Sequence, residues 1–165
     1  MTDRELFIDI LTGELPRFDR VFRAIEEVPK SKHGYKHDEK SRSTTDLMLI
    51  FASEAGMFPV ILKKGKLDFM SWPAPKWKTG EEVRKEFMKQ MKATIALAKK
   101  MNQKEWGVKA QMFMGEKMAW EDTKGKIAFE FLLDLIHHRG QLSTHLRPMG
   151  GKVPSIYGPS ADSSS

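Results

Sequence analysis

The residues best suited to chemistry lie in one stretch near the C-terminal end, residues 134–145, with the sequence DLIHHRGQLSTH. On a helix, at about 100° per residue, four of its polar side chains fall within a stripe about 60° wide: Asp134, His138, Gln141 and His145. A carboxylate and an imidazole one turn apart can point at one metal ion, as in the metal sites of helix bundles. The same spacing also fits a buried hydrogen bond between Asp134 and His138, and the pattern alone leaves both interpretations open.

Composition excludes several other kinds of chemistry. The chain of 165 residues has no cysteine, which excludes a disulfide framework, a thiolate nucleophile and a zinc site with cysteine ligands. We find no glycine-rich phosphate loop and no Ser-His-Asp arrangement. The formal net charge of +6 is compatible with anionic partners. The basic segments are scattered, however, so we do not expect the protein to bind nucleic acid.

Length and hydropathy predict one globular domain. A chain of this size corresponds to a single domain, which we place at residues 1–160, with 161–165 as a loose tail. No apolar run reaches the roughly 18 residues that cross a bilayer. The N-terminal sequence MTDRE lacks the basic-then-apolar order of a signal peptide. We therefore expect a cytoplasmic protein with no membrane partner.

Four long helices are expected to position the chemical residues. Apolar residues recur at helical spacing in four segments, at about 2–28, 43–65, 79–101 and 123–147. Capping boxes that begin at Ser43 and Thr79 mark the starts of the second and third helices. Pro16 lies inside the first helix, where we expect a kink or a break.

The connections between these helices are long. Residues 67–78 contain prolines and tryptophans and are predicted to form a loop, while 106–120 are compatible with a short extended piece or a hairpin. Such connections do not fit an up-down bundle with tight turns, so at least one should cross over. The predicted fold class is all-α, a four-helix bundle with at least one long crossover connection.

The C-terminal stretch also carries a resemblance to a known family. Residues 137–142 (HHRGQL), then 146–147 (LR) and 152–158 (KVPSIYG), resemble the C-terminal signature of the DinB/YfiT-like family. Residues 40–43 (KSRS), 46–47 (DL) and 52–54 (ASE) resemble the start of that family's second helix. Helix order and loop lengths agree over nearly the whole chain.

The resemblance implies a DinB/YfiT-like four-helix bundle that is often a homodimer. Members of this family typically bind a divalent metal, such as nickel or zinc, through three histidines. One comes from the second helix, and two form a His-x-x-x-His pair on the last helix. Some relatives are transferases or isomerases that act with a low-molecular-weight thiol.

Transferred residue by residue, the resemblance implies a modified metal site. His138 matches the second histidine of the pair, and Asp134 stands in place of the first. Ile50 stands at the second-helix position and cannot ligate a metal, whereas Glu54 follows one turn later on the same face. The resulting prediction is a divalent metal held by Glu54, Asp134 and His138, a more oxygen-rich donor set than three histidines.

Four further residues are predicted to line the pocket or support the ligands: Ile50, His137, Gln141 and His145. Each candidate also has a purely structural interpretation. Glu54 can be a solvated or ion-paired helix residue, and His145 a core or interface histidine.

Two functions remain open at this point. The resemblance implies a divalent-metal protein, with zinc or nickel, that acts as a thiol-dependent transferase on a small molecule and forms a homodimer. The alternative is a non-catalytic bundle in which Ile50 marks a degenerate metal site and which binds a small ligand or a partner chain. The first function requires three side chains from two helices to converge on one point.

Overall fold

Four long helices dominate the computed structural model, which describes residues 1–77 and 79–163; Lys78, Ser164 and Ser165 lie outside the described residues. The long helices are α1 (Asp3–Glu26), α2 (Thr44–Lys64), α3 (Gly80–Lys100) and α5 (Lys124–His145). Two short helices lie in the connections, η1 (Lys30–Lys32) and α4 (Gln103–Trp106). Three strands, β1 (Lys66–Asp68), β2 (Lys109–Met114) and β3 (Lys117–Thr123), complete the described chain.

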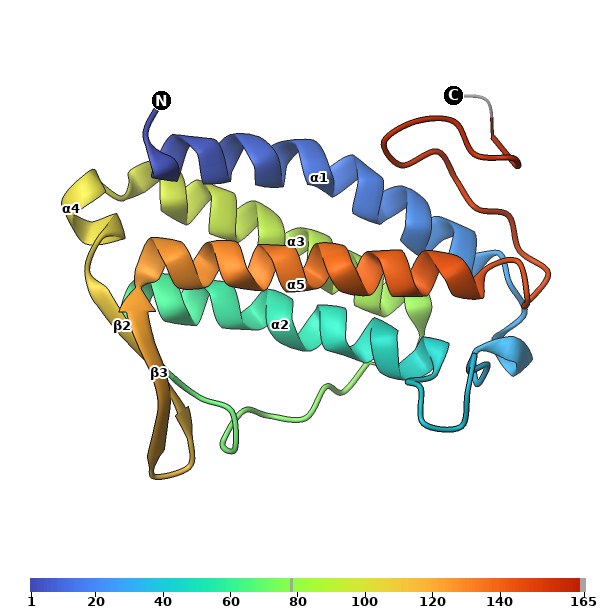
Figure 1. Ribbon diagram of the computed structural model, residues 1–165, viewed down its shortest axis with the longest axis horizontal. Coiled ribbons are helices and arrows are strands. Elements are labelled where there is room, and N and C mark those ends of the chain that lie inside the picture. Colours follow the sequence, from blue (N-terminus) through green and yellow to red (C-terminus); the bar gives the residue numbers. More distant parts are fainter. Residues whose placement is uncertain (78, 164–165) are drawn as a thin grey trace.

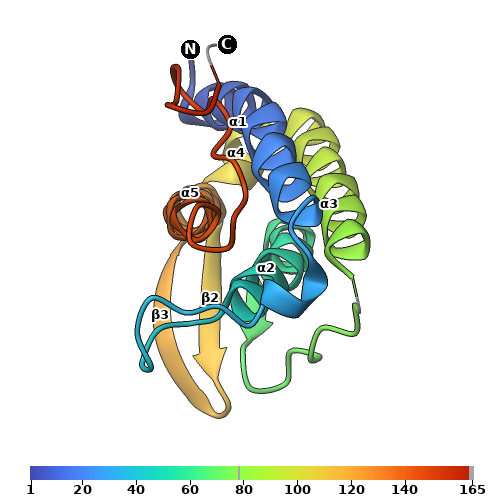
Figure 2. The same cartoon turned by 90° about the vertical axis from the view of Figure 1, so that its right-hand side faces the viewer.

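The long helices pack as a bundle in which α1 and α2 lie on a diagonal. Each of these two helices packs against both α3 and α5, as the end view in Figure 2 shows. The helices α1 and α5 run in one direction, and α2 and α3 run in the other (Figure 1). Because the neighbours α2 and α3 are parallel, the connection between them returns along the length of the bundle. This is the long crossover that the sequence predicted.

The all-α prediction is wrong, because the connections form a small sheet. Its strand order is β1-β2-β3, with β1 parallel to β2 and β2 antiparallel to β3. The hairpin of β2 and β3 agrees with the extended piece expected in 106–120. Strand β1 lies where a loop was predicted. With only three residues it has no alternation to recognise, and it exists because Leu67 pairs with Met112 far along the chain.

The helix ends follow the sequence signals, with one correction. Ser43 and Thr79 cap α2 and α3 through complete capping boxes, and Gly65 ends α2 with a positive φ of 65°. The expected kink or break at Pro16 is not a break, since α1 continues through it. Leu15 and Phe18, on either side of this proline, are buried, and their packing holds α1 together as one helix.

The core lies between the four helices and is rich in phenylalanine. Phe18, Phe22, Phe51 and Phe87 form one aromatic cluster that joins α1, α2 and α3, with neighbouring ring centroids 5.0–6.4 Å apart. The core therefore fixes the position of α2 in the bundle and its rotation about its own axis. Together these decide where the polar residues of α2 lie.

Helix α2 is the most apolar of the long helices. It is long and apolar enough to cross a membrane by length and composition, and half of its most apolar window is buried in the bundle. One such helix is weak evidence for a membrane span, because the core helix of a bundle meets the same test. Its burial carries the carboxylate of Glu54 into the space between α2 and α5.

Candidate metal centre

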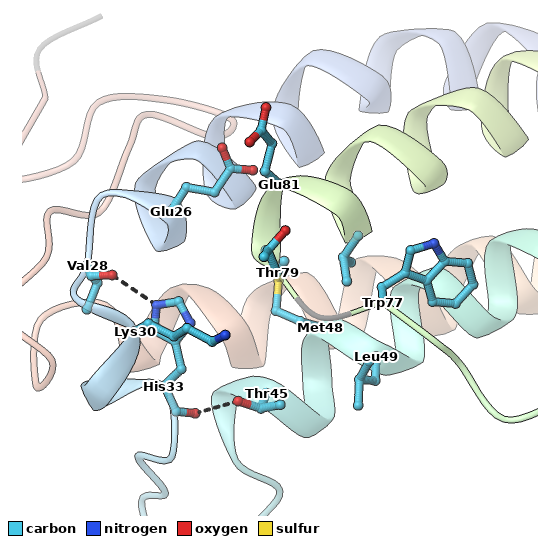
Figure 3. Close-up of a pocket in the computed structure, with 12 residues that line it drawn as sticks. Glu26, Val28, Lys30, His33, Thr45, Met48, Leu49, Trp77, Thr79 and Glu81 are labelled. Carbon is cyan, nitrogen blue, oxygen red and sulfur yellow. Dashed lines mark hydrogen bonds between the residues drawn. The ribbon is translucent and has the colours of Figure 1, made fainter.

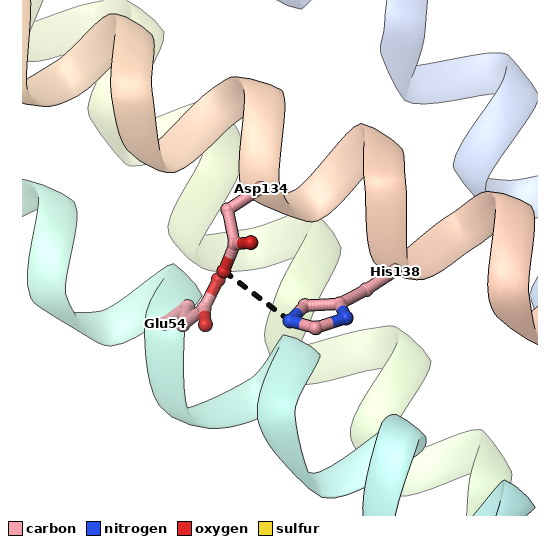
Figure 4. Close-up of side chains that lie close together, drawn as sticks. All are labelled: Glu54, Asp134 and His138. Atoms are coloured by element: carbon pink, nitrogen blue, oxygen red, sulfur yellow. Dashed lines mark ion pairs between the residues drawn. The ribbon is translucent and has the colours of Figure 1, made fainter. Parts of the chain in front are cut away.

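Three predicted ligands converge between α2 and α5 (Figure 4). Glu54, on α2, faces Asp134 and His138, which lie one turn apart on α5. Each residue offers one ligand atom, and these three atoms all lie within 4.8 Å of one another. The fold thus brings together Asp134 and His138, which the helical spacing indicated, and Glu54, which the family resemblance implied.

The three side chains differ in their exposure. The side chain of His138 is 6% exposed and that of Asp134 is 50% exposed, while Glu54 is half-buried. Atom Nε2 of His138 lies 3.2 Å from Oδ2 of Asp134. Atom Oε2 of Glu54 is buried and has no hydrogen-bond partner within the described residues. A buried carboxylate oxygen without a partner is costly, and a cation at this point would remove the cost.

Electrostatics at Glu54 favour a positive charge beside it. Burial raises the pKa of the Glu54 carboxyl from 4.5 to about 8, and the negative charge of Asp134 and a hydrogen bond to Asp134 add to the increase. Arg42 opposes the shift from outside the cluster. At neutral pH, in the absence of a cation, the carboxyl of Glu54 therefore holds a proton. A metal bound by Glu54 would displace this proton, because a carboxyl binds a metal in its deprotonated form.

Gln141 sets the orientation of the His138 ring. With its amide oriented as in the structure, Nδ1 of His138 donates to Oε1 of Gln141 at 2.8 Å. The Gln141 amide in turn donates from Nε2 to Nε2 of His137 at 2.9 Å. In the neutral imidazole, Nε2 of His138 then presents its lone pair toward the two carboxyls. Histidines that ligate metals are held in this way by an acceptor on the other ring nitrogen.

A cavity of about 370 Å³ adjoins the two carboxyls. Its wall comes from α2, α5 and the sheet region and is mostly apolar: Ile50, Met57, Phe69, Trp120 and Phe131. The rings of Phe69 and Trp120 stack with centroids 5.6 Å apart. Glu54 and Asp134 also line this cavity, as do Ser53 and Glu130. A small molecule with an apolar body can therefore lie in contact with the carboxyls.

The remaining predicted residues have separate places. Ile50 lies in the cavity wall, His137 is exposed, and Gln141 contacts both histidines 137 and 138. His145 lies two turns beyond His138, where Nδ1 and Oγ1 of Thr44 are 2.9 Å apart in a hydrogen bond. It does not belong to the converging group, so its interpretation as a further ligand has no support within the described residues.

Sequence reasoning missed the aromatic wall of the cavity. Trp120 lies on β3 opposite Met112, and Phe69 directly follows β1. The alternating pattern in 106–120 indicated a hairpin. It did not indicate which surface of the bundle the hairpin packs against. Arg42 was also missed, because it lies in a loop and acts on Glu54 only through space.

Another cavity of about 370 Å³ lies between the end of α1 and the starts of α2 and α3, and Figure 3 shows its lining. Both of its carboxylates and its histidine already have partners. Glu26 pairs with Arg84 at 2.7 Å, and Glu81 pairs with Lys85 at 2.7 Å. Atom Nε2 of His33 bonds to the carbonyl oxygen of Val28 at 3.0 Å. Since no group of ligand atoms converges there among the described residues, we assign no chemistry to this cavity.

Comparison with known proteins agrees with the fold. No family model matches the sequence, and no curated protein matches it. Among solved structures, the chain is similar to a DinB-like protein, YjoA, from Bacillus subtilis, with a TM-score of 0.68 and 16% sequence identity. The similarity covers 88% of this chain and 92% of the other. The chain therefore has a DinB-like fold, as the sequence resemblance predicted.

Proposed function

We propose that this chain of DinB-like fold binds one divalent cation through Glu54, Asp134 and His138 and acts with it on a small molecule in the adjoining cavity. The observation that carries the proposal is the buried, unpartnered Oε2 of Glu54 beside two further ligand atoms. Two ionised carboxylates and a neutral imidazole carry a charge of about −2, which one divalent cation balances.

The donor set favours particular cations. Two carboxylates and one imidazole form a harder donor set than three histidines, and such a set suits Zn²⁺ and Mn²⁺. Glu54, Asp134 and His138 would hold the cation with three ligands and leave room for a substrate atom, and the bound cation would supply Lewis-acid chemistry. Nickel suits this donor set less well, because Asp134 stands in place of one histidine of the family and Glu54, one turn after Ile50, offers oxygen and not nitrogen.

The residues around the cation would bind and orient the substrate. Phe69 and Trp120 offer a flat apolar wall for an aromatic or aliphatic group, and burial against them excludes water. Gln141 keeps Nε2 of His138 directed at the cation. The open coordination position and the apolar cavity together suit a reaction on a small apolar molecule.

The finer proposal is a transferase that uses a low-molecular-weight thiol, working as a homodimer. Because the chain has no cysteine, the sulfur of such a reaction must come from a diffusible thiol. A divalent cation lowers the pKa of a thiol that it binds, which makes the thiol reactive at neutral pH. The exposed side of Asp134 leaves the cation accessible from solvent for this second molecule.

The alternative is a bundle without catalysis that binds a small ligand in the same cavity. One observation favours it: Nε2 of His138 lies 3.2 Å from Oδ2 of Asp134, and a His138 ring with a proton on each nitrogen would pair with this carboxylate without a metal. It requires the carboxyl of Glu54 to keep its proton in a hydrogen bond with Asp134, and Oε2 then stays without a partner of its own. The two proposals therefore differ in what they require of Glu54.

Thermal unfolding with added metal tests the proposal. A cation at 100 times its Kd stabilises the folded state by about 2.7 kcal/mol, which raises Tm by roughly 5–10 °C for a chain of this size. We expect this increase with Zn²⁺ or Mn²⁺ in the untagged wild type and in Glu130→Gln, and its loss in Glu54→Gln. Glu130 is a matched control, because it lines the same cavity but is not one of the three ligands. An unchanged Tm in the wild type would support the non-catalytic alternative.

A further inference from the structure

A polar pocket of about 440 Å³ lies beside the metal centre, between the segment 37–42 and the C-terminal half of α5. Its polar lining includes His37, Lys40, Ser41, Arg42, Thr144 and His145. No aspartate or glutamate lines it. The pocket therefore combines two cations, two hydroxyls and two imidazoles, with no negative charge in its wall.

The two cations of this pocket have no ion-pair partner within the described residues, although Arg42 also acts electrostatically on Asp46 and Glu54 from a distance. Across residues 1–77 and 79–163, neither Lys40 nor Arg42 takes part in an ion pair. The guanidinium of Arg42 has five N–H donors in a fork that matches carboxylate and phosphate oxygens. Both cations can therefore serve a ligand without breaking an existing pair.

The side chains, not the helix end, provide the donors. The N-terminus of α2 adjoins the pocket, but its first amides already have acceptors: the N–H of Thr44 donates to the carbonyl of Tyr35 at 3.2 Å, and that of Thr45 to the carbonyl of His33 at 3.0 Å. The dipole of α2 adds a favourable field for an anion at this end. Specific recognition rests on Lys40, Arg42 and the hydroxyls.

One wall of the pocket is already ordered by hydrogen bonds. Oγ1 of Thr144 donates to the carbonyl of Gln141 at 2.7 Å, so Nε2 of His37 donates to Thr144 at 2.9 Å. The hydroxyl of Tyr35 then donates to Nδ1 of His37 at 3.0 Å. The rings of His37 and His145 meet with centroids 4.5 Å apart. These contacts hold His37 on α5, which reduces the entropy that this residue loses when a ligand binds.

We propose that this pocket binds the oxyanion group, a carboxylate or a phosphate, of a small molecule, with Arg42 and Lys40 as its charge partners. Their charge-assisted hydrogen bonds supply the affinity. Gln141 lines this pocket and also holds His138, so the bound anion lies beside the metal centre. The site does not require a metal, however, and stands independently of the proposed catalytic function.

The test uses metal-stripped protein titrated with sodium phosphate and with sodium succinate, at constant ionic strength maintained with sodium chloride. Binding is followed through the ring resonances of the histidines by NMR. We expect saturable binding of at least one oxyanion, weakened about 10-fold or more in the Lys40→Gln/Arg42→Gln double variant. Because both residues are exposed and unpaired, this variant should keep the wild-type helical circular dichroism.

A matched control removes the same charge elsewhere. Lys92→Gln/Lys100→Gln neutralises two exposed lysines on α3, and its affinity should equal that of the wild type. A preference for phosphate would identify a phosphoryl ligand, and a preference for succinate a carboxylate ligand; either supports the pocket. No saturable binding, or an equal loss in both double variants, would overturn it. Since no metal is present, neither failure affects the proposal for Glu54.

Discussion

The buried carboxyl of Glu54 should give the metal-free protein a characteristic pH dependence of stability. Its pKa is about 8 in the folded protein and 4.5 at its ordinary value, a difference of 8 − 4.5 = 3.5. Between these two values the folded state holds a proton that the unfolded state has released. The folded state therefore binds more protons, and the free energy of unfolding falls as pH rises through this window.

The size of the effect follows from the same shift. At about 1.36 kcal/mol per pKa unit, 3.5 units correspond to a loss of up to about 5 kcal/mol between pH 4.5 and 8. This is a large fraction of the stability of an ordinary domain. Glu54→Gln cannot ionise, so it should lose this part of the pH dependence and become more stable than the wild type at pH 8.

Urea unfolding of metal-stripped protein, followed by circular dichroism from pH 5 to pH 9, measures this difference. Glu130→Gln serves as the control, because Glu130 is an exposed carboxyl on the same cavity and should keep the wild-type slope. Equal slopes in the wild type and in Glu54→Gln would refute the reasoning, since they would mean that Glu54 ionises freely in the folded protein.

Three further predictions concern single contacts. Gln141→Leu removes the acceptor of His138 and should weaken metal affinity 10- to 100-fold, measured by competition with a chelating dye, with little change in metal-free stability. Arg139→Met removes the more buried of the two cations of Glu14, while Arg17 and the hydroxyl of Tyr157 remain on that carboxylate, and should lower the free energy of unfolding by about 1–3 kcal/mol in urea; an unchanged free energy of unfolding would contradict this. Gly125→Ala would place a Cβ in steric overlap with the indole of the buried Trp106 and should lower Tm by several degrees, whereas an unchanged Tm would show that the two elements separate easily.

Much of the candidate site was predictable because its signals are local. Asp134 and His138 are four residues apart, and the helical period alone places them on one face. The capping boxes at Ser43 and Thr79 likewise depend on neighbours in sequence and were located correctly. Glu54 required the resemblance, since nothing in the pattern of α2 indicates which element it faces.

The features that the sequence did not reveal depend on distant partners. Strand β1 is stabilised by its pairing with β2, more than 40 residues later. The stack of Phe69 and Trp120 requires the same sheet to be in place. The protonated state of Glu54 arises from burial and from Asp134, which only the packed bundle brings close. Tertiary context decides each of these, and no local propensity encodes it.

Calorimetric titration of untagged, metal-stripped protein with ZnCl₂ or MnCl₂, in two buffers of different ionisation enthalpy, tests the central claim most directly. The account predicts one bound cation per chain and, at pH 7, the release of about one proton from Glu54, whose pKa is about 8. Glu54→Gln should bind far more weakly and release no proton from this group. The account would be contradicted if neither metal saturated the protein, or if the wild type and Glu54→Gln gave identical titrations.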